Sequence, residues 1–365
     1  MTEIPSLPGL RQAIDAVDDQ VLALLNRRAA LAAEVGRLKA EAAPDALFHA
    51  PAREREVLAR LEAASAGPFP APAVRTVFQE IMSACLSLEK PLRVAFLGPE
   101  GTFTHLAARH QFGGSGQALP QGTIQAVFQA VERQRADYGV VPVENATEGS
   151  VDSTLDAFLD SSLAICAEIL LPVDQALLLR PELEVGGVRR VYSHPQALGQ
   201  CRRWLEAHLP GVDRVEAPST SEAARLARED AEGAAVASEL AADLFGLRVA
   251  ETKIQDLAAN ATRFLVLGPK SAEPTGRDRT TLLAMAQDGP GALLRLLEPL
   301  ARRGLNLSRI QSRPTRRKLW EYVFFLDVEG HAADPALAEA LEELRGVCAS
   351  LKVLGSYPRA LEVAR

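Results

Sequence analysis

Hydrophobic residues recur every three or four positions near the start of the chain, which predicts one amphipathic helix over about residues 6–42. The spacing alternates regularly, as in a heptad seam that packs against another helix. At ~1.5 Å per residue this helix is roughly 55 Å long, so we expect its apolar stripe to need a partner chain. The stripe comprises Leu10, Ile14, Val17, Val21, Leu24, Leu31, Val35 and Leu38. Two more helical patterns follow, after Pro51 and from Val74 to Leu88.

From residue 92 the pattern changes to short apolar runs that alternate with helical spacing. This alternation is typical of a doubly wound α/β unit. We expect strands at residues 93–98, 138–143, 188–192, 234–237 and 260–268, with helices between them. A second lobe is expected to begin near Pro172 and to extend to about residue 250.

The last ninety residues predict a smaller α+β domain after a polar linker at residues 274–278. Strand patterns at 280–285, 305–310, 322–328 and 351–357 enclose helical patterns after Asp288 and at 335–344. The order βαββαβ is that of a ferredoxin-like fold. We therefore expect three domains, at residues 1–91, 92–272 and 278–357.

Composition narrows the class of protein. The net charge of −7, without a basic stripe, argues against a nucleic-acid partner. No apolar stretch approaches the ~20 residues of a membrane span, and the start resembles no secretory signal, so we expect no membrane partner and a cytoplasmic location. The four cysteines form no C-x-x-C pair, which indicates neither a metal site nor a disulfide framework.

One cation interrupts the apolar stripe of the first helix. Arg28 lies on that stripe, and Lys39 shares its face about three turns later. A buried guanidinium usually pairs with a carboxylate, so a structural ion pair with a glutamate is one interpretation. The other is an anion site, because several cations on inward-facing helical positions suit a small dicarboxylate.

The first ninety residues resemble the all-helical chorismate mutase family. The resemblance rests on Leu10, Arg11, Ile14, Val17 and Asp18, then on Leu24, Arg27, Arg28, Glu34, Val35, Gly36 and Lys39, and then on Arg53, Glu54, Arg55 and Glu56. It implies an intertwined helical dimer in which Arg28, Lys39 and the partner's Arg11 hold the carboxylates of chorismate. It also implies that Glu54 binds the substrate hydroxyl, that Arg53 lies beside it, and that no cofactor is needed.

Three positions depart from the best-known members of this family. Ala50 occupies an aspartate position, Cys85 a serine position, and Glu89 the position of a glutamine that donates to the ether oxygen. An ether oxygen and an ionised carboxylate both only accept hydrogen bonds, so Glu89 must be protonated to help. Because of these departures, an inactive mutase domain remains an alternative.

A polar stretch lies between a strand and a helix in the middle of the chain. The strand ends near Val143, Asn145 and Thr147 follow, and helical spacing begins at Val151. A helix N-terminus in such a loop presents free backbone N–H groups to a small anion. A capped connection without function explains the same residues, and Ser193, Asn260 and Thr262 each have similar structural explanations as cap, turn former and strand residue.

Taken together, these segments resemble prephenate dehydratase over about residues 93–270. The motifs are residues 98–103, 139–145, 193–196 with Gln200 and Cys201, and 262–264. The resemblance implies a two-lobed fold like that of periplasmic binding proteins, with the active site in the cleft. It implies catalytic roles for Asn145, Ser193, Gln200 and above all Thr262, which we expect to donate to the departing hydroxyl. Arg263 fits either a substrate carboxylate or a structural ion pair.

The C-terminal domain resembles the phenylalanine-binding ACT domain that follows prephenate dehydratase. The two signatures are residues 291–293 and 311–314. The resemblance implies that L-phenylalanine binds near Gly291, Ala292, Leu293, Asn306, Gln311 and Ser312. Many relatives have glutamate at the position of Gln311, so the lost carboxylate is expected to weaken feedback inhibition.

The sequence therefore predicts a bifunctional, homodimeric or larger enzyme that uses chorismate and prephenate and is regulated by L-phenylalanine. Two alternatives remain at this point: a dehydratase with an inactive mutase domain, and a non-catalytic amino-acid sensor. A sensor has no need of Thr262 beside Asn260, or of Arg11, Arg28, Lys39 and Glu89 in one domain.

Overall fold

The computed structural model describes residues 6–42, 51–89, 91–257, 259–287, 289–315 and 321–360. The chain divides into two compact units, one of Met1–Leu92 with Phe112–Gln117 and one of Arg93–Gln111 with Ala118–Arg365. Ala50 lies outside the described residues, as does the side chain of Glu89. Among the described segments, no helix has the length and apolar character that a bilayer crossing requires.

The described part of residues 1–92 forms three helices, as predicted: α1 (Leu7–Ala42), α2 (Pro51–Ala64) and α3 (Ala71–Glu89). The small core of this unit comes from α2 and α3, where Leu58, Val74, Met82 and Cys85 are buried. The heptad stripe of α1 stays outside that core, and Leu24 in its middle is 64% exposed. A stripe this apolar and this exposed marks a helix built to pack on something else.

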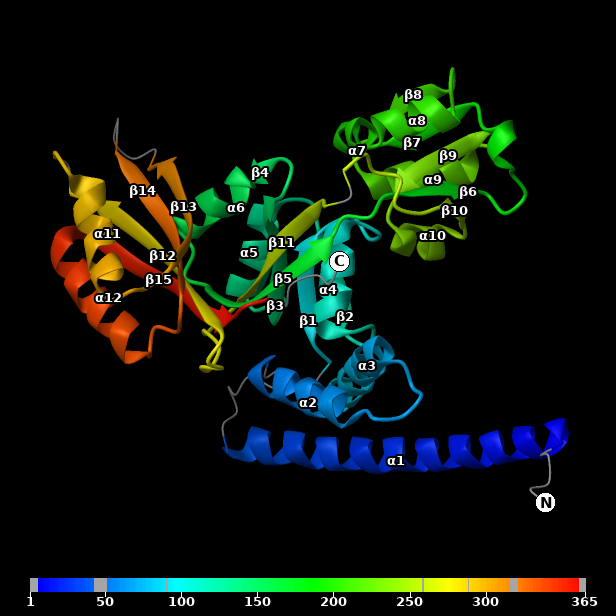
Figure 1. Cartoon of the computed structure of the whole chain (residues 1–365), viewed down its shortest axis with the longest axis horizontal. Helices are drawn as coiled ribbons and strands as arrows, with labels where there is room; N and C mark the ends of the chain where they lie inside the picture. The colour runs from blue at the N-terminus through cyan, green and yellow to red at the C-terminus, as the bar shows by residue number, and fades with distance from the viewer. Residues whose placement is uncertain are drawn as a thin grey trace. The chain divides into compact units, whose positions relative to one another are not determined.

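The second unit contains a two-lobed α/β region (Figure 1). The sheet of its first lobe has the strand order β2-β1-β3-β11-β5, with β4 paired to β3. Its strands are β1 (Arg93–Leu97), β2 (Gln117–Gln121), β3 (Tyr138–Asn145), β4 (Gly149–Ser150), β5 (Ala164–Pro172) and β11 (Ala261–Gly268), and its helices are α4 (Phe103–Phe112), α5 (Ile124–Glu132) and α6 (Asp152–Phe158). Strands β1 and β3 are parallel, whereas β11 runs antiparallel to both β3 and β5.

The chain leaves this sheet after β5, builds the second lobe, and returns as β11. The second sheet has the order β10-β6-β9-β7-β8. Its strands are β6 (Ala176–Leu179), β7 (Arg190–Ser193), β8 (Asp213–Glu216), β9 (Gly233–Ala237) and β10 (Arg248–Glu251), and its helices are α7 (Pro195–Gln200), α8 (Arg202–His208), α9 (Thr220–Glu229) and α10 (Glu239–Phe245). Two crossover segments therefore join the lobes, one after Pro172 and one before Ala261.

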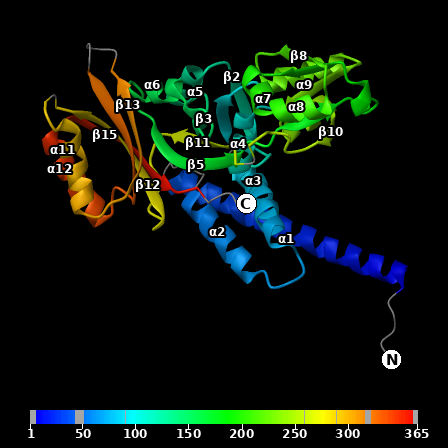
Figure 2. The same ribbon diagram turned by 45° about the horizontal axis from the view of Figure 1, so that its top comes forward.

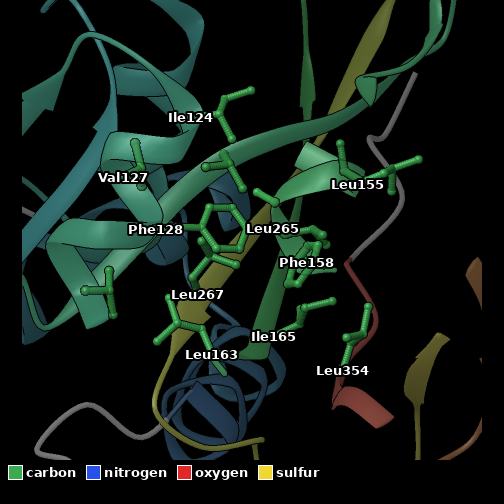
Figure 3. Close-up of a cluster of buried hydrophobic side chains, with 14 of the residues drawn as sticks. Ile124, Val127, Phe128, Leu155, Phe158, Leu163, Ile165, Leu265, Leu267 and Leu354 are labelled. Carbon is green, nitrogen blue, oxygen red and sulfur yellow. The ribbon is translucent and has the colours of Figure 1, made fainter. Parts of the chain in front are cut away.

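The C-terminal domain has the predicted βαββαβ order: β12 (Asp278–Ala286), α11 (Ala292–Arg302), β13 (Leu307–Pro314), β14 (Tyr322–Glu329), α12 (Pro335–Val347) and β15 (Cys348–Pro358). Its sheet order is β13-β14-β12-β15, and both helices cover one face (Figures 1 and 2). The other face shares a core with the first lobe, where Leu354 of β15 joins Phe158 and Ile165 (Figure 3). A side chain at Gly355 would collide with the backbone of Ile165, so glycine permits this close approach.

Candidate active sites

The first candidate site is a cavity of about 340 Å³ within the helical unit. It gathers most of the side chains predicted to bind a dicarboxylate. Its lining consists of Arg28, Leu31, Ala32, Val35, Lys39, Arg53, Glu54, Val57, Met82, Cys85 and Leu86. Among the described lining residues, three cations and one carboxylate accompany mostly apolar side chains, a composition that suits a small anion with an apolar ring.

Arg28 is the informative residue of this cavity. Its Nη1 atom is buried and has no hydrogen-bond partner, so the glutamate pair considered for it is not formed at this nitrogen. A buried guanidinium nitrogen without a partner is costly, and an anion in the cavity would satisfy it. Arg53, by contrast, forms an exposed ion pair with Glu56 at 2.6 Å.

Three predicted residues are not brought into this cavity by the described chain. Arg11 is exposed on α1 and is absent from the lining, which is consistent with its predicted role in the partner's site. Glu89 is the last residue of α3, and its side chain lies outside the description, as does Ala50. Their roles remain predictions.

The second candidate site is a cleft of about 430 Å³ between the two α/β lobes. Asn145, Gln200 and Thr262 line it, as the sequence predicted. The first lobe contributes Leu97, Gly98, Thr102, Phe103, Thr104, Gly122, Pro142, Asn145, Thr262 and Phe264; the second contributes His194, Gln196, Ala197, Gln200, Pro218, Ser219 and Thr220; Val173 and Gln175 come from the first crossover.

A buried hydrogen-bond cluster places the hydroxyl of Thr262. Asn145 ends β3, and Thr262 pairs with it across the sheet in β11. The amide nitrogen of Asn145 donates to Thr262 Oγ1 at 2.8 Å and to Asn260 Oδ1 at 3.1 Å. Since Thr262 Oγ1 accepts here, its own hydrogen is free to donate into the cleft.

The polar loop after β3 differs from the expected anion loop. Strand β4 turns back onto β3, so the segment is a tight hairpin before α6 begins. Asn145 Oδ1 accepts from the backbone N–H groups of Thr147 and Glu148, at 3.0 and 3.2 Å, and from the Thr147 hydroxyl. Because these donors already bond to Asn145, they are not available to an anion. The expected anion site at this loop is therefore wrong, and the loop is a structural turn that orients Asn145.

Ser193 does not line the cleft. Its side chain is fully buried, and its hydroxyl donates to the backbone oxygen of Val236 at 2.6 Å, linking β7 to β9. The next residue, His194, faces the cleft and caps α7, where its Nδ1 accepts from the N–H of Gln196. The structure therefore places Ser193 in support of the cleft wall.

Neutral donors dominate the described lining of the cleft, which contains no lysine or arginine. Helices α4 and α9 both begin at its edge, with Thr102 and Ser219 as their capping side chains. The first N–H groups of a helix lack intrahelical partners, and the helix dipole adds positive potential there. These starts supply donors from opposite lobes.

Gln175 is a cleft residue that sequence reasoning missed. It is 2% exposed and lies on the crossover that the sequence placed near Pro172. A polar residue next to an apolar strand such as 176–179 is by itself only a weak indication of a binding site. Only the fold shows that this position enters the cleft.

Arg263 is structural. Its side chain donates to Glu168 Oε2 at 2.8 Å, to Asp327 Oδ2 at 2.5 Å and to Tyr357 Oη at 2.9 Å. Burial opposes its charge, but neighbouring Tyr357, Asp327 and Glu168 raise the pKa of Arg263 well above its ordinary value. This buried network joins β11, directly after Thr262, to the C-terminal sheet.

The predicted phenylalanine-binding residues lie on two faces of the C-terminal domain. Gly291, Ala292 and Leu293 start α11, Asn306 precedes β13, and Ser312 faces away from the first lobe. Gln311 points the other way, where its Oε1 accepts from the Ser150 hydroxyl at 3.2 Å. The described chain therefore does not bring Gln311 together with the other five.

Comparison with known proteins agrees with this division of the chain. Three family models match: Chorismate mutase type II at residues 10–90, Prephenate dehydratase at 94–272 and ACT domain at 280–346. A bifunctional chorismate mutase/prephenate dehydratase of Aquifex aeolicus is 47% identical over 359 residues, which cover 97% of this chain and 98% of the relative.

Two of the solved structures that resemble this chain are the following. A prephenate dehydratase from Arthrobacter aurescens, in complex with L-Phe, is 38% identical with a TM-score of 0.68, covering 73% of this chain and 90% of that one. GqqA, described as a novel type of quorum quenching acylases, is 35% identical with a TM-score of 0.67, covering 73% of this chain and 97% of that one.

Proposed function

Because the chain belongs to the family of bifunctional chorismate mutase/prephenate dehydratases, we propose that it converts chorismate to prephenate and then prephenate to phenylpyruvate. It is a multidomain enzyme with one active site for each reaction. The observation that carries the dehydratase assignment is the Thr262 hydroxyl, oriented by Asn145 toward a cleft of the right size. The domain limits that we propose are residues 1–91, 92–272 and 278–357.

The mutase reaction needs no acid, base or cofactor, because bonds break and form in one pericyclic step. Catalysis then consists of holding the compact conformer and placing cations where negative charge develops. Arg28 and Lys39 are suited to the substrate carboxylates, and Glu54 to its hydroxyl, since all three line one cavity. The unpartnered Nη1 of Arg28 supports this assignment most directly.

We also propose a homodimer through α1. The exposed apolar stripe of this 36-residue helix is long enough to bury against the same stripe of a second copy. In that arrangement Arg11 of one copy completes the chorismate site of the other. A soluble biosynthetic enzyme of this class is expected in the cytoplasm.

The dehydratase reaction removes two groups from prephenate. The bond from the ring to its carboxylate breaks, the electron pair enters the ring, and the bond to the 4-hydroxyl breaks on the far side. Carbon dioxide and hydroxide leave, and aromatisation drives the step. The Thr262 hydroxyl is a weak acid, so its role is to donate a hydrogen bond to the departing oxygen.

Other cleft groups are suited to the two carboxylates of prephenate. Neutral donors can hold anions when several converge, and helix starts add favourable potential. The starts of α4 and α9 face the cleft from opposite lobes, so each can meet one carboxylate. The amide of Gln200 adds a donor from the end of α7.

We propose that L-phenylalanine inhibits the enzyme through the C-terminal domain. The solved relative with L-Phe shows that a protein of this fold binds this amino acid. In this chain Gly291, Ala292, Leu293, Asn306 and Ser312 are the candidates for direct contact. Gln311 is better suited to transmit the signal, since it contacts the first lobe.

One assay tests the proposal. Purified protein is supplied with chorismate, and the products are followed over time by chromatography. Prephenate followed by phenylpyruvate is expected. Phenylpyruvate from supplied prephenate alone would mean an inactive mutase, and no turnover of either compound would favour a sensor. Quorum-quenching acylase activity, with no turnover of prephenate, would favour the activity described for GqqA.

A further inference from the structure

Gln175 lies at the place where the chain crosses from the first lobe to the second. Its backbone is held on both sides by the returning crossover: its N–H donates to Gln255 Oε1 at 3.0 Å, and its carbonyl accepts from the N–H of Ile254 at 3.0 Å. The side chain is therefore fixed at its root, and it enters the cleft between the lobes.

The amide of Gln175 is only half satisfied. Its nitrogen donates to Gln200 Oε1 at 3.3 Å, within the same cleft lining. Its oxygen is buried and has no hydrogen-bond partner, although the residue is only 2% exposed. A buried acceptor without a donor destabilises the folded protein unless a ligand supplies the donor.

The chemistry of prephenate limits what that donor can be. At neutral pH its two carboxylates are ionised, and these groups and its keto oxygen only accept hydrogen bonds. The 4-hydroxyl is the one group of prephenate that carries a hydrogen to donate. We infer that Gln175 accepts a hydrogen bond from this hydroxyl. This inference rests on the function proposed above.

Gln175 and Thr262 would then hold the leaving hydroxyl from two sides. Thr262 donates to its oxygen, and Gln175 accepts its hydrogen. The pair fixes the direction of the carbon–oxygen bond that breaks. The departing hydroxide keeps its own hydrogen, which stays hydrogen-bonded to Gln175. Gln175 is thus a specificity residue for the 4-hydroxyl, and through Gln200 it also positions a second cleft amide.

The test compares two ligands that differ only in this hydroxyl. One is prephenate, and the other is the analogue with hydrogen in place of the 4-hydroxyl, used as a competitive inhibitor. Gln175→Met keeps a similar volume but offers only a weak sulfur acceptor. We expect this variant to weaken prephenate binding by about tenfold while the inhibition constant of the analogue changes little. Equal weakening of both ligands, or of neither, would overturn the inference.

Gln196→Met is the matched control, because it makes the same substitution at another glutamine of the cleft lining. We expect it to affect both ligands equally. If Gln175→Met does not fold, Thr262→Ala serves instead: it should still bind prephenate more tightly than the analogue, and equal binding would refute the role of Gln175. Wild-type enzyme that turns over no prephenate would sink the proposed function itself.

Discussion

The amide nitrogen of Asn145 lies 2.8 Å from the hydroxyl oxygen of Thr262, and the direction of this hydrogen bond is determined by the turn next to it. The backbone N–H groups of Thr147 and Glu148 both point at the other end of the amide, which must therefore be the oxygen. Asn145 donates, Thr262 accepts, and the Thr262 hydrogen is left for a ligand. We therefore expect Asn145 to act by positioning the Thr262 hydroxyl.

Asn145→Asp should reverse this hydrogen bond. A carboxylate cannot donate, so Thr262 would turn its hydrogen toward the oxygen atoms of the introduced carboxylate and away from the substrate. We expect the dehydratase kcat to fall by about 10²-fold, as for loss of one oriented donor, with a smaller change in KM. Steady-state assays with prephenate measure both constants.

Two controls separate this effect from damage to the fold. Thr262→Ala should lose a similar factor, and the double variant should lose little more, because both changes remove the same donor. Chorismate mutase activity of all three proteins should remain normal. Near-normal dehydratase activity in Thr262→Ala would contradict the role of the hydroxyl.

Arg28→Ala should remove mutase activity and spare the dehydratase. The unpartnered Nη1 of Arg28 is available to a substrate carboxylate, so its loss is expected to lower kcat/KM for chorismate by about 10²-fold or more. Arg27→Ala is the matched control, because Arg27 is the preceding residue and is absent from the cavity lining. Equal loss in both variants would point to a general effect on α1.

We expect mutase activity to depend on pH through Glu89. It stands at the end of α3, at the position where the resemblance to chorismate mutases implies a glutamine that donates to the ether oxygen. Only the protonated carboxyl can donate, so mutase activity should decline as rising pH removes that proton. Glu89→Gln should make the profile nearly flat. A flat profile in the unaltered enzyme would refute the role.

The sequence was sufficient for the fold class, because hydrophobic periodicity and turn residues are local, but it did not predict strands β2, β4, β5, β6, β8 and β10 or the antiparallel pairing of β11. The long helix α1 and the βαββαβ order of the C-terminal domain both follow from spacing. The direction in which a polar side chain points, and the group with which it pairs, depend on residues far away in the sequence. Ser193 was expected in the cleft, but it bonds to Val236, a residue 43 positions away in sequence. Gln175 was missed because its burial depends on the second crossover.

His105 should make the first lobe sensitive to mild acid. It is buried, its ring stacks on Phe96, and its Nδ1 accepts from the N–H of Gly101 at 3.1 Å. Burial lowers the pKa of His105 below its ordinary value of 6.5, although the charge of Glu100 opposes this. The neutral ring is therefore the form that stabilises the fold.

The sign of the pH effect follows from this shift. The contribution of His105 is complete above about pH 6.5 and is lost as the pH falls toward the lowered folded value, because the unfolded state binds the proton first. Urea unfolding of the wild type should show a lower free energy at pH 5.5 than at pH 7.5. His105→Phe keeps the ring contact and should reduce that difference; an unchanged difference would assign it to other groups.

Ser150 should connect phenylalanine binding to the dehydratase cleft. Its hydroxyl donates to Gln311 Oε1 at 3.2 Å and accepts from Arg309 Nη2 at 2.7 Å, so it joins the hairpin strand β4 to β13 of the C-terminal domain. In the same hairpin Gly149 pairs with Asn145, which orients Thr262. A shift of β13 on binding L-phenylalanine would therefore reach Thr262 through one short hairpin.

Ser150→Ala removes both hydrogen bonds while leaving the cleft residues in place. We expect dehydratase activity without inhibitor to stay within about twofold of wild type, and the L-phenylalanine concentration for half inhibition to rise by roughly 5-fold or more, the lower range of allosteric coupling. Calorimetry should show the same loss in reverse: a saturating, unreactive prephenate analogue should weaken L-phenylalanine binding less in Ser150→Ala than in wild type, because coupling between two binding sites is reciprocal. Ser153→Ala, an exposed change at the start of α6, is the control. Unaltered inhibition in Ser150→Ala would show that the signal travels elsewhere, and the buried Arg263–Asp327 ion pair would then be the next contact to test.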